Sequence, residues 1–103
     1  MIKVTVFYPN SHGCKFDMAY YCKKHIPMVQ TLLGSALKGV SVEEGLAGGE
    51  VGAPPAHLAM GHLTFDSLDA FMSSFLPNAD QIKGDVPNYT NIIPTIQISE
   101  VRI

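Results

Sequence analysis

Residues 16–34 read FDMAYYCKKHIPMVQTLLG, and this stretch decides the fold because it carries the best-marked helix boundaries in the chain. Asp17 can act as an N-cap, since its side-chain oxygen can accept a hydrogen bond from the open N–H groups of a first turn. Gly34 suits the position after the last turn, where a glycine readily adopts the left-handed conformation that ends a helix. The stretch therefore predicts a helix between these two residues.

The interior of this helix combines an apolar stripe with one break. The stripe, at spacings of three and four, consists of Cys22, Ile26, Val29 and Leu33. We therefore expect Cys22 to be buried as a small hydrophobic residue. Pro27 has no N–H and collides with the carbonyl four residues earlier, so the helix is expected to bend or restart around His25. Tyr21 lies one turn before His25 and on the same side of the helix.

The composition indicates one globular domain over residues 1–103. Only 16% of the residues are charged, which suggests that self-association covers part of the surface. A net charge of −2 without any cluster of Lys or Arg argues against a nucleic-acid partner. The chain shows no signal-peptide pattern and no apolar run long enough to span a membrane. With two cysteines that form no C-x-x-C pair, we expect a reducing, cytoplasmic setting.

The rest of the chain predicts strands and a second helix. Strands rich in β-branched and aromatic residues are expected at 2–8, 37–46, 56–65 and 95–103. A second helix is expected from a cap at Asp66 or Ser67, with Pro77 ending it or starting a short segment through Ile82. Loops are expected at 47–55 and 83–91.

The resulting order, β-α-β-β-α-β, predicts a ferredoxin-like α+β fold, a four-stranded antiparallel sheet with two helices on one face. The other face carries a mixture of apolar and small polar residues, namely Thr5, Phe7, Ser41, Met60, His62, Gln97 and Ser99. A sheet face open to water would carry more Lys and Glu. We therefore expect this face to pair with a second copy in a homodimer, and the pairing to leave a lined cavity for a small molecule.

The pattern F-x₃-Y-Y-x₃-H-x-P, at Phe16, Tyr20, Tyr21, His25 and Pro27, resembles the EthD family when taken with this topology. The resemblance covers essentially the whole chain and implies a dimeric α+β barrel. It also implies a small-molecule site in the cleft between the sheet and the first helix. Related barrels include cofactor-free monooxygenases acting on aromatic polyketides and muconolactone-type isomerases. EthD itself is associated with ethyl tert-butyl ether degradation beside a cytochrome P450 system.

His25 is the leading catalytic candidate, because an imidazole titrates near neutrality and can take or give a proton. Tyr21 is expected to orient this ring or to bind a substrate oxygen. A structural interpretation stays open beside the catalytic one, in which His25 caps a carbonyl freed by Pro27. The resemblance favours the catalytic interpretation, since the family pattern places this histidine at the cleft.

Four further residues are candidates for substrate binding: Phe7, Tyr20, His62 and Tyr89. The aromatic rings among them either line a pocket for an aromatic ligand or pack at helix and loop edges. His62 lies in mid-strand, where a histidine is also common as an interface or core residue. The histidines form no i, i+4 pair and no H-E-x-x-H motif, so we expect no metal site and no bound cofactor.

The sequence thus favours a small-molecule enzyme of catabolism, a cofactor-free oxidoreductase or isomerase acting on an oxygenated or aromatic metabolite. His25 would be its acid and base. A non-catalytic module that carries a hydrophobic ligand for another enzyme is the main alternative, because no complete nucleophile, metal or cofactor motif is present. A third interpretation is a haem-binding barrel with His25 or His62 as the axial ligand.

Overall fold

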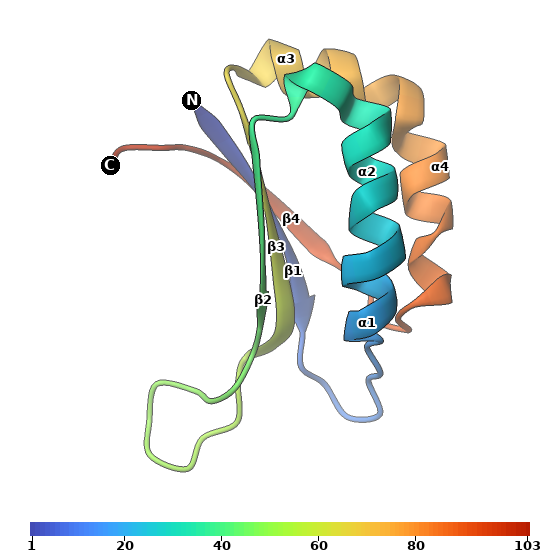
Figure 1. Ribbon diagram of the computed structural model, residues 1–103. Helices are drawn as coiled ribbons and strands as arrows, with labels where there is room; N and C mark the ends of the chain where they lie inside the picture. The colour runs from blue at the N-terminus through green and yellow to red at the C-terminus, as the bar shows by residue number, and fades with distance from the viewer.

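The computed structural model describes all 103 residues as one antiparallel sheet with every helix on the same side of it (Figure 1). The strands are β1 (Ile2–Pro9), β2 (Gly39–Glu44), β3 (His57–Phe65) and β4 (Thr95–Glu100). Their order across the sheet is β2-β3-β1-β4, and each neighbouring pair is antiparallel. This order confirms the predicted ferredoxin-like α+β fold.

Two helical crossovers form the second layer. The first consists of α1 (Met18–Tyr20), a π-helical turn (Tyr21–His25), α2 (Ile26–Leu33) and a 3₁₀ turn (Gly34–Ala36). The second consists of α3 (Leu68–Phe75), a 3₁₀ turn (Leu76–Asn78), α4 (Ala79–Gly84) and a further 3₁₀ turn (Val86–Asn88). A short segment therefore does follow Pro77, and it extends two residues past its predicted end at Ile82. None of these helices has the length and apolar character needed to cross a membrane.

The first crossover helix begins and ends where the sequence predicts, but it widens in the middle. Asp17 caps it, with Oδ1 accepting a hydrogen bond from the backbone N–H of Tyr20 at 3.0 Å. Gly34 ends it with φ at +59°. Between these ends, the N–H of Ile26 bonds to the carbonyl of Tyr21, five residues back instead of four. The expected break near Pro27 thus takes the form of a π-helical turn, a feature common at functional sites.

This wide turn explains why the prediction for Cys22 is wrong. Cys22 is exposed. The extra residue in the turn rotates the buried face, so that Tyr21 and His25 point inward in place of Cys22. The rest of the predicted stripe is buried, namely Ile26, Val29 and Leu33.

The strands differ from the prediction in length, and β1 and β3 pair irregularly at one end. β4 ends at Glu100 instead of residue 103, and β2 is shorter than expected at both ends. The register of β1 and β3 shifts at Tyr8 and Pro9 through a β-bulge, which reverses the side-chain alternation near the start of β3. Leu58 therefore packs on the helix side of the sheet, against the cluster of buried residues that includes Tyr8 and Ala59.

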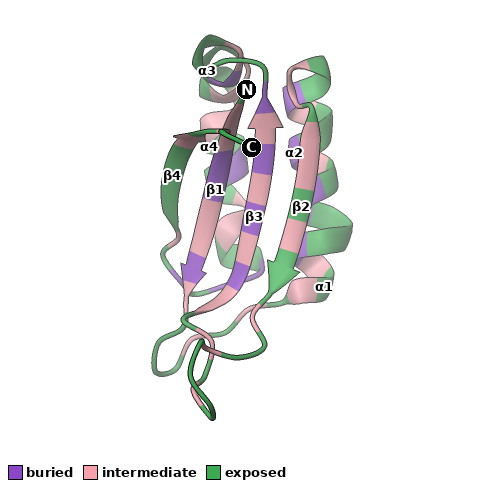
Figure 2. Cartoon of the chain, turned by 90° about the vertical axis from the view of Figure 1, so that its left-hand side faces the viewer, coloured by how far each residue is buried: buried purple, intermediate pink, exposed green.

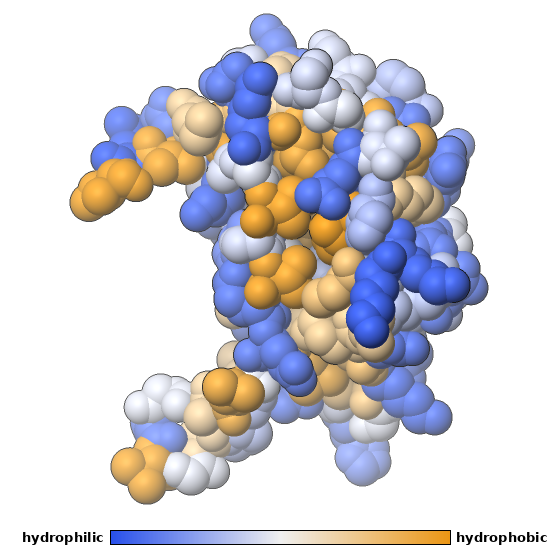
Figure 3. Space-filling view, viewed as in Figure 1, coloured by the Kyte–Doolittle hydropathy of each residue, from blue (hydrophilic) through white to orange (hydrophobic).

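The core lies between the sheet and the helices and falls into two clusters. One is aliphatic and phenylalanine-rich and contains Val4, Val29, Leu33, Leu63, Phe65, Phe71 and Ile82. The other carries tyrosine hydroxyls and contains Tyr8, Tyr21, Ile26, Ala59, Tyr89 and Ile92. Figure 2 shows that buried positions concentrate on the central strands β1 and β3, whereas β4 is almost entirely exposed. Apolar side chains gather at the seam between the two layers, bordered by hydrophilic surface (Figure 3).

Candidate functional site

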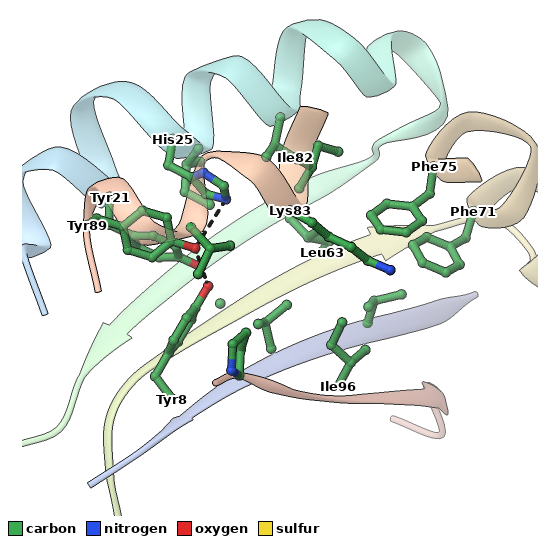
Figure 4. Close-up of a pocket in the computed structure, with 17 residues that line it drawn as sticks. Tyr8, Tyr21, His25, Leu63, Phe71, Phe75, Ile82, Lys83, Tyr89 and Ile96 are labelled. Carbon is green, nitrogen blue, oxygen red and sulfur yellow. Dashed lines mark hydrogen bonds between the residues drawn. The ribbon is translucent and has the colours of Figure 1, made fainter. Parts of the chain in front are cut away.

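A cavity of about 90 Å³ lies between the sheet and the helical layer, where the two core clusters meet. Its walls are mostly apolar. The polar side chains that reach it are Tyr8, Tyr21, His25, Lys83 and Tyr89. Figure 4 shows the tyrosines gathered with the histidine at one end of the cavity, while the lysine extends toward the other. The cavity therefore combines an apolar interior with a hydroxyl-rich end and a single cationic side chain.

His25 is held between Asp85 and Tyr89. Its Nδ1 lies 2.8 Å from Oδ2 of Asp85, and its Nε2 lies 3.4 Å from the hydroxyl of Tyr89. An ionised carboxylate can only accept hydrogen bonds, so Nδ1 carries the proton and donates it. In the neutral ring, Nε2 then holds a lone pair directed toward Tyr89 and the cavity.

The charges of this pair follow from its surroundings. Burial lowers the pKa of His25 below its ordinary value of 6.5, and the hydrogen bond and negative charge of Asp85 offset only part of that effect. Burial raises the pKa of Asp85, but hydrogen bonds from Asn88, His25 and Tyr20 outweigh it and leave this pKa below its ordinary range. At neutral pH the carboxylate is ionised and the imidazole is neutral, which is the state of a general base.

The hydroxyl of Tyr89 continues the chain of polar contacts toward the sheet. It lies 2.8 Å from the hydroxyl of Tyr8 on β1, so four side chains connect in the order Asp85, His25, Tyr89 and Tyr8. Figure 4 shows the last three of them with the contacts that join them. Burial raises the pKa of Tyr8, Tyr21 and Tyr89, which keeps their hydroxyls neutral. Neutral hydroxyls at this end of the cavity can donate hydrogen bonds to a ligand oxygen.

Tyr21 fixes the plane of the His25 ring. The two rings stack with their centroids 5.5 Å apart and 15° between their planes. The hydroxyl of Tyr21 reaches Gly61 in the middle of β3, where a Cβ atom would collide with it. The absence of a side chain at Gly61 therefore makes room for Tyr21, and Tyr21 in turn supports the imidazole.

Comparison with known proteins places this chain in a family. A family model described as the EthD domain matches residues 15–92. The chain belongs to the EthD family. The crystal structure of an EthD-like protein from Ralstonia eutropha JMP134 is 49% identical and superposes with a TM-score of 0.95, covering 99% of this chain and 92% of that one. These findings confirm the resemblance of the F-x₃-Y-Y-x₃-H-x-P pattern, and this pattern contributes Tyr21 and His25 to the cavity.

More distant solved structures share the fold of this EthD protein. An EthD family protein from Bacillus halodurans C-125 is 16% identical with a TM-score of 0.75, and the match covers 99% of both chains. A candidate antibiotic biosynthesis monooxygenase from Deinococcus radiodurans is 17% identical with a TM-score of 0.65, covering 100% of this chain and 94% of that one. No curated protein matches the chain.

Three of the six residues predicted for the site, His25, Tyr21 and Tyr89, line the cavity. A fourth, Tyr20, lies behind it, where its hydroxyl donates a hydrogen bond to Oδ1 of Asp85 at 2.8 Å. This contact is the main reason why the pKa of Tyr20 is raised. Tyr20 thus joins the cluster through the carboxylate that orients His25.

Phe7 and His62 are placed apart from the other four residues, on the open face of the sheet. There His62 contacts Oγ1 of Thr5 through Nδ1 at 3.0 Å and Oε1 of Glu43 through Nε2 at 2.6 Å. The ring of Phe7 lies 5.1 Å from the ring of His57. Neither Phe7 nor His62 lines the cavity, so the sheet separates them from His25. A role for either in binding substrate stays a prediction.

Sequence reasoning missed three polar residues of the site, Asp85, Lys83 and Tyr8. Asp85 falls in a stretch predicted as a loop and lies 60 residues from His25, so no local pattern connects them. The position of Tyr8 could have been predicted from the sequence, because strand alternation places it on the same face as Val4 and Val6. That face is the one that the helices cover.

The residues present do not fit a haem group or a metal cluster. No group of three or more His, Cys, Asp or Glu side chains is close enough together to hold a metal ion. Both ring nitrogens of His62 are hydrogen-bonded within the chain. The Nε2 side of His25 contacts the hydroxyl of Tyr89 and faces a cavity of about 90 Å³, which is far smaller than a porphyrin. An axial haem ligand at either histidine is therefore not supported by this geometry.

Proposed function

We propose that this EthD protein is a small-molecule enzyme in which Nε2 of His25 takes a proton from the substrate and returns it. The observation that carries the proposal is the pair of Asp85 and His25 in the wall of an apolar cavity. His25 is only 5% exposed, and its unprotonated nitrogen faces the cavity side. A neutral base oriented by a carboxylate is well suited to abstracting a proton at neutral pH.

The tyrosines supply the second half of the proposed chemistry. When a proton leaves a carbon next to a carbonyl, or leaves a phenol, negative charge develops on the substrate oxygen. The hydroxyls of Tyr8 and Tyr89 can donate hydrogen bonds to that oxygen inside a site that excludes water, where such bonds are strongest. The predicted substrate class, an oxygenated or aromatic metabolite, agrees with this pairing of a base and hydroxyl donors.

Two reactions share this first step. Return of the proton to a different carbon completes an isomerisation. Alternatively, dioxygen reacts with the substrate anion, so that a CH₂ group and O₂ give a carbonyl group and water, with all electrons supplied by the substrate. The second reaction is that of a cofactor-free oxidoreductase, and the fold shared with the candidate monooxygenase from Deinococcus radiodurans is compatible with it.

A non-catalytic binding module is the second candidate function. It is favoured by the predominantly apolar wall of the cavity and by the fact that each buried side-chain polar atom already has a hydrogen-bond partner. Such a module would hold a hydrophobic ligand without transferring its proton. Catalysis and mere binding differ in whether protons of the ligand exchange with the solvent.

We also propose that the protein acts as a homodimer joined through the open face of the sheet. Thr5, Phe7 and Met60 on that face are partly or fully shielded from solvent already, and few charged side chains lie among them. Sedimentation of the protein at micromolar concentration tests this proposal, which predicts a dimer and is contradicted by a monomer.

Deuterium exchange tests the proposed chemistry with simple model compounds in place of the natural substrate. A panel of carbon acids, such as β-diketones and phenolic ketones, is incubated with the protein in D₂O and followed by proton NMR. The proposal expects the wild-type protein to speed deuterium incorporation into at least one member, and expects His25→Gln to abolish the effect. Binding of a panel member without any acceleration would favour the binding module, and equal acceleration by His25→Gln would remove His25 from the mechanism.

A further inference from the structure

The cavity has one cation at its mouth, and no group of the chain neutralises it. Lys83, near the end of α4, is exposed and lines both the inner cavity and a wider groove beside it. Figure 4 shows its side chain extended along the cavity toward Phe71 and Phe75. The ion pairs of this chain involve other residues, and Lys83 takes part in none of the side-chain hydrogen bonds. Its ammonium group is therefore available to a ligand.

The surroundings of Lys83 favour an anion over a neutral partner. The residues beside it in the cavity wall are apolar, including Phe75, Ile82 and Ile96. The nearest carboxylate in sequence, Asp85, is already held by hydrogen bonds from His25, Tyr20 and Asn88. A charge beside low-dielectric walls attracts an opposite charge more strongly than one in open water does.

The size of the cavity indicates where such an anion would lie. Pockets that enclose a drug-sized ligand measure roughly 300–1,000 Å³. This cavity measures about 90 Å³, so it can enclose only a small part of a ligand, such as one ring or a short branched chain. The adjoining groove measures about 640 Å³, and it shares Lys83, Val86, Pro94 and Ile96 with the cavity. A longer ligand therefore crosses from the cavity to the groove beside Lys83.

We infer that the ligand of this site is an amphipathic anion, whose apolar end enters the cavity toward Tyr8 and His25 while its carboxylate or equivalent acidic group binds Lys83 at the mouth. This inference rests on the proposed function and adds a substrate class to it. His25 acts on the enclosed end of the ligand, and Lys83 selects ligands by their charge. A neutral analogue of the same shape is expected to bind more weakly because it lacks the partner for this ammonium group.

Benzoate and benzamide provide matched probes, because they share one ring and differ in the charge of the substituent. Binding to the full-length protein is followed by NMR of its backbone amides, which also shows whether the probe reaches the cavity. Lys83→Met keeps the apolar stem and the helix propensity but removes the charge. Lys23→Met, which removes an exposed lysine on the outer side of the first crossover, is the matched control.

The inference expects the wild-type protein and Lys23→Met to bind benzoate more tightly than benzamide. Lys83→Met should weaken benzoate about three- to fivefold, the range of a partly exposed ion pair, and leave benzamide unchanged. Added salt should weaken benzoate binding to the wild-type protein and to Lys23→Met, which both keep Lys83, but not to Lys83→Met. Equal affinities of the wild-type protein for both probes, an unchanged benzoate affinity in Lys83→Met, or no amide shift around the cavity with either probe would each overturn the inference.

Because this binding assay does not depend on turnover, it can fail separately from the proposed function. Loss of deuterium exchange in His25→Gln together with no preference for benzoate would contradict the proposal of an anionic ligand. It would leave the proposal that His25 is the base intact. A preference for benzoate that depends on Lys83, together with full exchange activity in His25→Gln, would contradict the proposal that His25 is the base. It would leave the proposed class of ligand intact.

Discussion

Two histidines of this chain contact a carboxylate, yet only one of them, His25, lines the apolar cavity between the sheet and the helices. His62, on the open face of the sheet, uses both ring nitrogens within the chain, one toward Thr5 and one toward Glu43. His25 uses Nδ1 for Asp85 and leaves Nε2 with a longer contact of 3.4 Å to the hydroxyl of Tyr89. A carboxylate partner alone therefore does not indicate a functional histidine. The informative feature is a second nitrogen that faces a cavity.

The surroundings of the two pairs differ as much as their geometry. The side chain of Glu43 is 53% exposed, so water and salt screen its interaction with His62. The side chains of His25 and Asp85 are 6% and 15% exposed, which strengthens their interaction and shifts both pKa values. The same pair of functional groups thus lies on an exposed surface in one place and forms the proposed base in the other.

The largest effect is expected from removing the buried imidazole. His25→Gln should lower the rate of deuterium exchange by roughly 10²- to 10⁴-fold, the usual contribution of a general base. His12→Gln, in an exposed loop, is the matched control and should exchange at the wild-type rate. A rate in His25→Gln equal to that of the control would show that the cavity histidine is no more catalytic than a surface one.

Asp85→Asn should lower the exchange rate by a smaller amount, roughly 10- to 100-fold, because the imidazole remains but its proton is no longer fixed on Nδ1. Asp85 raises the pKa of His25, so its loss should lower that pKa further. A base works only when unprotonated, and the acid side of the rate profile should therefore move to lower pH. A profile that moves to higher pH would contradict the assigned role of Asp85.

Gly61→Ala should disturb the support of the His25 ring without touching it directly. The new Cβ collides with the hydroxyl of Tyr21, so the tyrosine must move from its stacked position. We expect the free energy of unfolding to fall by about 1–3 kcal/mol, as is usual for overpacking, with slower exchange as well. Gly49→Ala is the control, since a Cβ there meets open space. Urea denaturation measures both, and equal stabilities of the two variants would argue against this contact.

The smallest effect is expected on the open face. His62→Gln removes the contact with the exposed Glu43, so the free energy of unfolding should fall by about 1 kcal/mol or less. The exchange rate should stay near that of the wild-type protein, because the sheet separates this position from the cavity. A loss of exchange as large as that of His25→Gln would remove the distinction between the two histidines.

Local patterns made much of the fold predictable. The cap at Asp17, the helix end at Gly34 and the alternation of the strands were sufficient to predict the order of the elements and the two-layer arrangement. Cys22 was placed wrongly because a regular helical spacing cannot show a π-helical turn. The turn depends on the hydrogen bond from Ile26 to Tyr21, which only the structure reveals.

Only the part of the candidate site that comes from a single helix was predictable from the sequence. Tyr21 and His25 share a helix face and a family pattern, so sequence spacing brings them together. Asp85 comes from a segment far along the chain, and its carboxylate reaches His25 only because the second crossover packs beside the first. The separation of Phe7 and His62 from the cavity follows from which face of the sheet the helices cover. Which face the helices cover depends on the packing of the whole fold, and no local sequence pattern determines it.

The most direct test of this account is a titration of His25 followed by the ¹⁵N chemical shifts of its ring nitrogens. We predict a pKa below the ordinary value of 6.5 for His25, and a neutral ring that carries its proton on Nδ1 and its lone pair on Nε2. A pKa above that value, or a neutral ring with its proton on Nε2, would contradict the claim that His25 is a base facing the cavity.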